Sequence, residues 1–138
     1  SGVEGFRGGH DQARRAQRVA QLAGTAGPAV THFDDVRYVD LLARDLDAAR
    51  AFVAAELGGL AGPDARSGQL REFLLAYLAT DGNATATAAA LGLHRNTARQ
   101  RLARAEELRG VPVTRHRREL HAALVLAGTL GEAVLPDA

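Results

Sequence analysis

The feature that most constrains the fold is the segment from Gly82 to Gly110, GNATATAAALGLHRNTARQRLARAEELRG. Asn83 suits the N-cap of a helix of about eight residues ending at Leu91, and Gly92 tolerates the left-handed conformation that often follows a helix. His94 then takes the cap position of a longer helix over residues 95–109. A short helix, a glycine-containing turn and a longer helix have the spacing of a helix-turn-helix, so we predict a mainly α fold.

The longer helix has two different faces. Ala98, Leu102, Ala105 and Leu108 fall within one arc at about 100° per residue, and we expect this arc to face the core. On the opposite face lie Asn96, Arg99, Gln100, Ala103 and Arg104, with Arg95 and Thr97 at the leading end. In the shorter helix, residues 88–90 are all alanine, which predicts close approach by a neighbouring helix.

The charges of the chain are unevenly distributed. All seventeen basic side chains are arginine, and the formal net charge is only +1. Residues 94–118 nevertheless hold eight arginines against two glutamates, whereas the rest holds nine arginines against fourteen acids. A compositional preference for arginine would not remove acids from one segment, so this basic segment predicts an anionic partner.

The polar face of the longer helix has the side chains that read DNA bases. Arginine can hold guanine through two hydrogen bonds, and asparagine or glutamine can hold adenine in the same way. This chemistry makes Arg95, Asn96, Arg99 and Gln100 the candidate base readers, with Arg104 as a contact of lower sequence specificity. Asn83 and Thr85 lie at an electropositive helix N-terminus and are candidate phosphate contacts.

A second interpretation keeps the same helices without DNA. The chain would then be a helical dimerisation or regulatory interaction module whose arginines are merely solvated. The absence of acids between Gly82 and Ala105 favours the DNA interpretation, because nothing in that stretch repels phosphate.

The remaining sequence predicts three regions. Residues 1–34 have a strand-helix-strand pattern and are interpreted as the remnant of an α/β domain. Residues 35–67 are predicted to be a helical connector, with a cap at Asp45 and a glycine-rich linker, GGLAGPDARSG, at 58–68. Residues 68–138 form the predicted helix-turn-helix domain, which ends in a helix over about 115–130.

Other kinds of chemistry find little support in the sequence. There is no cysteine, no metal-binding pattern among the five histidines, and no nucleophile or nucleotide-binding motif. We therefore expect a protein that is not an enzyme and has no cofactor or metal. No apolar run is long enough to cross a bilayer, and we expect a cytoplasmic protein that does not contact the membrane. The absence of methionine indicates a sequence that begins inside a longer protein or after processing.

The stretch LREFLLAYLATDGNATATAAALGLHRNTARQRLARAEELRGVPV resembles the C-terminal region of the PucR/CdaR family, bacterial regulators of purine catabolism and sugar-diacid use. Its core is similar to the Fis-type helix-turn-helix. The resemblance extends over residues 70–130, and GN, AALGLHRNT, RL and EEL.G are its most specific parts. Upstream, GVEGFRGGHDQARRAQRVAQ and VTHFDDVRYVDLLARD look like the end of a GGDEF-like middle domain and the helices after it.

The resemblance implies transcriptional control through double-stranded DNA. It places His94, Arg95 and Thr97 near bases or neighbouring phosphates. It places Asn83, Thr85, Arg99 and Arg101 near the DNA backbone. Ala98 stands where the family usually has leucine, which affects core packing, and Gln100 stands where tyrosine is common, which affects the bases read.

Two further partners are expected. One short recognition helix reads only a few base pairs, so we expect a homodimer with half-sites about 34 Å apart. The helices within 36–57 and the C-terminal helix are the candidate dimer surfaces. A small-molecule effector is expected to bind an upstream domain.

Overall fold

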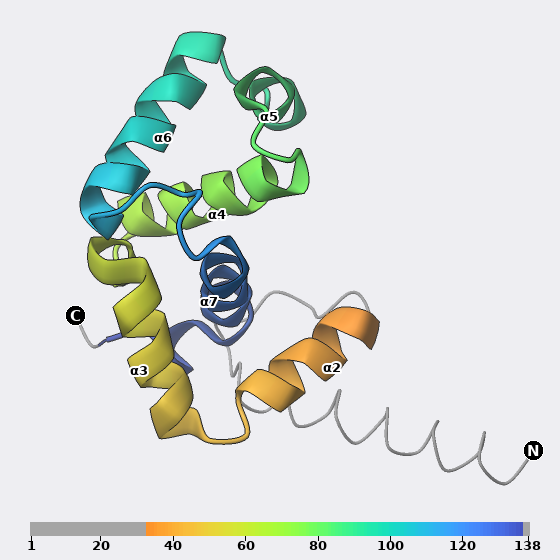
Figure 1. Ribbon diagram of the computed structural model, residues 1–138, viewed down its shortest axis with the longest axis vertical. Coiled ribbons are helices and arrows are strands. Elements are labelled where there is room, and N and C mark those ends of the chain that lie inside the picture. The colour runs from red at the N-terminus through yellow and green to blue at the C-terminus, as the bar shows by residue number, and fades with distance from the viewer. Residues whose placement is uncertain (1–32, 137–138) are drawn as a thin grey trace, which may run out of the picture.

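The computed structural model describes residues 33–136, and within this range every regular element is a helix (Figure 1). The elements in chain order are α2 (Phe33–Leu42), α3 (Leu46–Leu57), η1 (Gly58–Ala61), α4 (Ala65–Ala79), α5 (Ala84–Leu91), α6 (Arg95–Arg109), α7 (Arg117–Leu130) and η2 (Gly131–Ala133). The predicted mainly α fold is confirmed for this range. The predicted α/β remnant over 1–34 lies outside the described residues, except for its last two positions, which begin α2.

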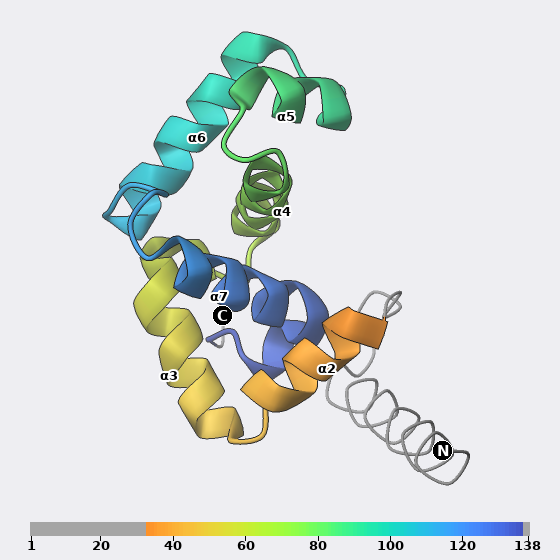
Figure 2. The same ribbon diagram turned by 45° about the vertical axis from the view of Figure 1, so that its right-hand side comes forward.

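Helices α4, α5 and α6 pack against one another and form one end of the molecule in both views (Figures 1 and 2). Helix α4 buries Leu70, Phe73, Leu74 and Leu78 in the core. The predicted bounds of α5 and α6 agree with the structure. The sequence therefore defines the helix-turn-helix correctly.

Helix α7 lies at the centre of the other half of the molecule, where it contacts α2, α3 and α4. Seven of its side chains are buried, namely Leu120, Ala122, Ala123, Leu124, Leu126, Ala127 and Leu130. It begins at Arg117, two residues later than predicted, because residues 113–116 form turns and His116 has a left-handed φ of 52°. Since α7 is covered within the chain, little of its apolar face remains for a dimer.

The predicted linker at 58–68 has a different structure from the one expected. Residues 58–61 form η1, with Leu60 and Ala61 buried, and α4 begins at Ala65. A Cβ atom at Gly59 would lie 2.7 Å from the carbonyl oxygen of Leu108, so this glycine permits close backbone packing against α6. Gly58 and Gly59, which belong to the predicted linker, thus lie against the end of α6. The division of the chain into domains here stays a prediction.

One hydrophobic core joins the connector to the helix-turn-helix. It includes Val53 and Leu57 of α3, Leu60 of η1 and Phe73 of α4, each fully buried. Of the three alanines at 88–90 in α5, Ala88 is buried, whereas Ala89 and Ala90 are exposed, so close packing involves one of the three. Across residues 33–136, no helix has the length and apolar character needed to span a membrane.

Candidate nucleic-acid interface

Local hydrogen bonds fix the turn between α5 and α6. The Asn83 side chain caps α5 by accepting from the N–H of Ala86 at 2.9 Å. At the other end of α5, Gly92 adopts φ 66° and ψ 34°, and the N–H of Leu93 donates to the carbonyl of Ala88 at 2.8 Å. These are the bonds of a Schellman motif, in which glycine takes the left-handed position without steric cost. The turn therefore holds α6 at a defined angle to α5.

A pair of threonine hydroxyls, which we did not predict, fixes α5 against the end of α4. The Thr87 Oγ1 lies 2.8 Å from the Thr80 Oγ1 and donates to the carbonyl of Asn83 at 2.8 Å. Thr87 has no exposed surface. The only sequence signal was a threonine on the inner face of a short helix, where its hydroxyl needs a partner.

His94 is the N-cap of α6, as predicted. Its Nδ1 accepts from the backbone N–H of Asn96 at 3.0 Å. The ring is exposed, so Nε2 is the ring nitrogen left to contact a ligand. In a neutral imidazole whose Nδ1 accepts, Nε2 carries the proton and can donate to a phosphate or base oxygen.

Most predicted contact residues share one surface of α6. Arg95, Asn96, Arg99, Gln100 and Arg104 are exposed there, and Thr97 and Arg101 are half-buried. The opposite face is buried as expected, with Ala98 and Ala105 having no exposed surface. Asn83 and Thr85 are separate from this group, because they lie at the end of α5 away from Gly92, roughly 12 Å along the helix axis.

The surface of α6 is strongly basic. Within residues 33–136, the guanidinium groups of Arg95, Arg99 and Arg101 form no ion pair, whereas Arg104 lies 3.2 Å from a carboxylate oxygen of Glu107. The other acid of α6, Glu106, accepts from the N–H of Val113 at 2.9 Å and thereby fixes the loop after the helix. Both acids are on the second half of α6, which leaves its first half free for an anionic ligand.

Arg109 has a structural role that the sequence analysis missed. Its side chain is only 1% exposed, although it was counted in the basic segment. Its Nε donates to the carbonyl of Glu56 at 2.9 Å, Nη1 to that of Pro112 at 2.8 Å and Nη2 to that of Arg115 at 2.8 Å. Nη2 also lies 3.5 Å from the Glu56 carboxylate. Arg109 thus joins α3, α6 and the loop before α7.

The described part of the chain contains no group of three or more histidine, aspartate or glutamate side chains arranged to hold a metal ion. What the geometry defines is a basic, exposed helix presented by a rigid turn. These features place the chain in the helix-turn-helix class of proteins.

Comparison with known proteins agrees with this class. Residues 70–126 match the family described as the PucR C-terminal helix-turn-helix domain. The resemblance of this region to the PucR/CdaR family is therefore confirmed.

Two curated proteins are similar to the chain. It is 44% identical over 98 residues to the transcriptional activator PmfR of Paenarthrobacter nicotinovorans, which is 71% of this chain and 20% of the activator. It is also 44% identical over 70 residues to an uncharacterized protein in the pkwA 5′ region of Thermomonospora curvata, which is 51% of this chain and 39% of that protein. The chain thus spans well under half of either relative. No solved structure shows significant similarity to it.

Proposed function

We propose that this chain is the DNA-binding part of a transcription regulator, and that α6 enters the major groove of duplex DNA. The observation that carries the proposal is the first half of α6, which is basic, exposed and without an acid. An α-helix fits the major groove, where its N-terminal residues meet base edges and its flanks meet phosphates. The similarity to the activator supports transcriptional control as the outcome of binding.

Different side chains of the interface have different proposed tasks. Arg95, Asn96, Arg99 and Gln100 would read bases, because they are exposed on the leading part of α6. His94 and Thr97 approach bases or adjacent phosphates, and Asn83, Thr85 and Arg101 contact the backbone. Arg104 can exchange its exposed ion pair with Glu107 for a phosphate, since such surface pairs contribute only about 0–1 kcal/mol.

We further propose that two copies bind one duplex in the cytoplasm. One recognition helix contacts only a few base pairs, so specificity requires a second copy, with half-sites about 34 Å apart. Duplexes selected from fragmented genomic DNA at a stated salt concentration should then contain inverted repeats with this spacing. Selected sites with one unrepeated motif would count against two-fold binding.

The first test compares two arginine substitutions on the same helix. Arg95→Ala should cost about 1–3 kcal/mol on the preferred duplex and relax the preference at one base position, because a base contact is lost. Arg104→Ala should weaken binding to all duplexes alike, because a phosphate contact carries no sequence information. Dissociation constants on a panel of single-base variants measure both effects.

Two outcomes of this test would contradict the proposal at different levels. Equal losses on every duplex for Arg95→Ala would refute base reading by that residue. Affinity for duplex DNA that does not fall with salt would refute DNA binding altogether and favour a protein-interaction module, because each phosphate contact lowers log K by about 0.9 per log unit of salt.

A further inference from the structure

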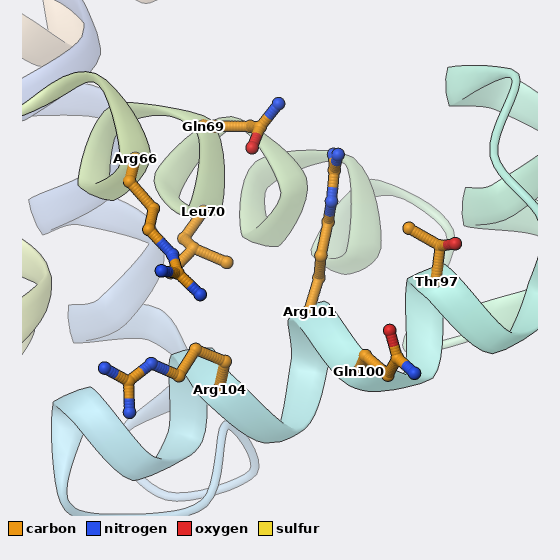
Figure 3. Close-up of a pocket in the computed structure, with 7 residues that line it drawn as sticks. All are labelled: Arg66, Gln69, Leu70, Thr97, Gln100, Arg101 and Arg104. Atoms are coloured by element: carbon orange, nitrogen blue, oxygen red, sulfur yellow. The ribbon is translucent and has the colours of Figure 1, made fainter.

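A basic groove lies between the first turns of α4 and one side of α6 (Figure 3). Its volume is about 190 Å³. Arg66 and Gln69 line it from α4, and Thr97, Gln100, Arg101 and Arg104 line it from α6, with Leu70 as its apolar contribution. The four α6 residues follow helical spacing over roughly two turns, so they form one continuous edge of the groove.

The charges of the groove are all positive. Three guanidinium groups line it and no acid does. Within residues 33–136, neither Arg66 nor Arg101 forms an ion pair. Asp64, two residues before Arg66, is engaged elsewhere: it accepts from the N–H and the hydroxyl of Ser67, and these hydrogen bonds lower the pKa of its carboxyl group.

The position of Arg66 adds to this field. It lies in the first turn of α4, where the helix dipole already presents partial positive charge and disfavours a cation. No other basic side chain in these turns is open to solvent in the same way, since Arg71 turns inward and donates to the carbonyls of Leu60 and Gly62 at 2.6 and 2.7 Å. An anion in the groove would compensate the charge of Arg66.

The groove is continuous with the proposed DNA-contacting surface. All four α6 residues of the groove are also proposed DNA contacts, namely Thr97, Gln100, Arg101 and Arg104. When a helix occupies the major groove, the phosphate backbone passes along its flanks. The strand on the α4 side would therefore meet this groove.

We propose that the groove receives a backbone phosphate of duplex DNA, and that Arg66 and Gln69 extend the interface from α6 onto α4. This inference rests on the proposed function. The guanidinium groups supply charge-assisted donors, and the Gln69 amide supplies a further N–H for a phosphate oxygen. Because α4 contacts only the backbone, these residues hold the orientation of α6 without reading sequence.

The test substitutes Arg66→Gln in the full chain and measures affinity for a preferred and a random duplex over a series of salt concentrations. The matched control is Arg118→Gln, which removes the same charge from α7, where Arg118 is exposed and lines a different groove. Arg66→Gln should lower the salt slope by about 0.9 and leave the ratio of the two affinities unchanged. The control should keep the slope of the unsubstituted chain.

Two outcomes would overturn the inference. An unchanged slope in Arg66→Gln, beside clear salt dependence in the unsubstituted chain, refutes the α4 contact alone. If the slope is unchanged and inorganic phosphate at constant ionic strength shifts the NMR signals of Arg66 and Gln69, the groove binds a small anion and not the DNA backbone. Absence of salt-dependent binding by the unsubstituted chain refutes the proposed function and this inference with it. Circular dichroism of each variant checks that the helices are intact.

Discussion

At the scale of single residues, the arginines of the basic segment divide into two groups. Arg95, Arg99 and Arg104 are exposed on α6, whereas Arg109, on the same helix, is buried and donates hydrogen bonds to three carbonyls. Its guanidinium charge is balanced by Glu56, which belongs to α3. A count of arginines therefore overstates the positive charge that is available to contact DNA. Arg109 stabilises the fold instead.

Replacing Arg109 with alanine should destabilise the protein by roughly 3–5 kcal/mol. The change leaves three carbonyls and the half-buried Glu56 carboxylate without their donor. Arg115→Ala is the matched control, because its side chain is exposed and its carbonyl, which accepts from Arg109, is retained. We expect the control to change the free energy of unfolding by no more than about 0.5 kcal/mol. Urea denaturation measures both, and similar losses in the two variants would contradict a structural role for Arg109.

The exposed residues of the site were predictable, and Arg109 was not, for one physical reason. Exposure of Asn96 or Gln100 follows from the helical period alone, because these positions are opposite Ala98 and Ala105. Arg109 lies four residues after Ala105, so the helical period places it on the buried arc of α6. This spacing was the sequence signal for its burial. Its partners are supplied by α3 and by the loop after α6, and such long-range contacts cannot be read from periodicity.

At the scale of helices, the helix ends that are fixed by a capping side chain or a glycine were predicted correctly. Asp45, Asn83 and His94 cap α3, α5 and α6 through their own side chains, and Gly92 ends α5 in the left-handed conformation. In segment 58–68 the sequence did not predict η1, because glycine has two uses. It permits flexibility in a tether, and it also permits two backbones to approach closely, which is its use at Gly59. The two uses can be distinguished at Gly59 only once it is known that α6 packs against it.

Two glycine-to-alanine substitutions should therefore have opposite effects. Gly59→Ala should lower the thermal stability, because the new Cβ would lie 2.7 Å from the Leu108 carbonyl oxygen and force η1 away from α6. Gly68→Ala should raise stability by about 0.5–1 kcal/mol, because Gly68 is within α4 and the nearest atom to the new Cβ would be 3.6 Å away. Thermal unfolding followed by circular dichroism compares them. If Gly59→Ala were as stable as the unsubstituted chain, η1 would not pack against α6 as described.

At the scale of the whole molecule, the connector and the helix-turn-helix share structure. Helix α7 packs on both α3 and α4, and Leu60 of η1 is fully buried between elements that the sequence assigned to different regions. Arg109 and Glu56 add a polar link across the same junction. This packing favours one cooperative folding unit over residues 39–134. A displacement of α3 would then also move the C-terminal end of α6.

Leu60→Ala distinguishes one cooperative unit from two independent domains. Removing this buried side chain should cost about 2–5 kcal/mol, and the loss should appear equally in α3 and in α6 if they unfold together. Leu41→Ala is the control, since Leu41 is 65% exposed and its truncation should change stability by no more than about 0.5 kcal/mol. Native-state hydrogen exchange of the slowest amides in α3, α6 and α7 gives the free energy of opening for each helix. If Leu60→Ala accelerated exchange in α3 alone and left α6 and α7 at their original values, the helix-turn-helix would fold independently of the connector, and the boundary predicted at 58–68 would be a true domain boundary.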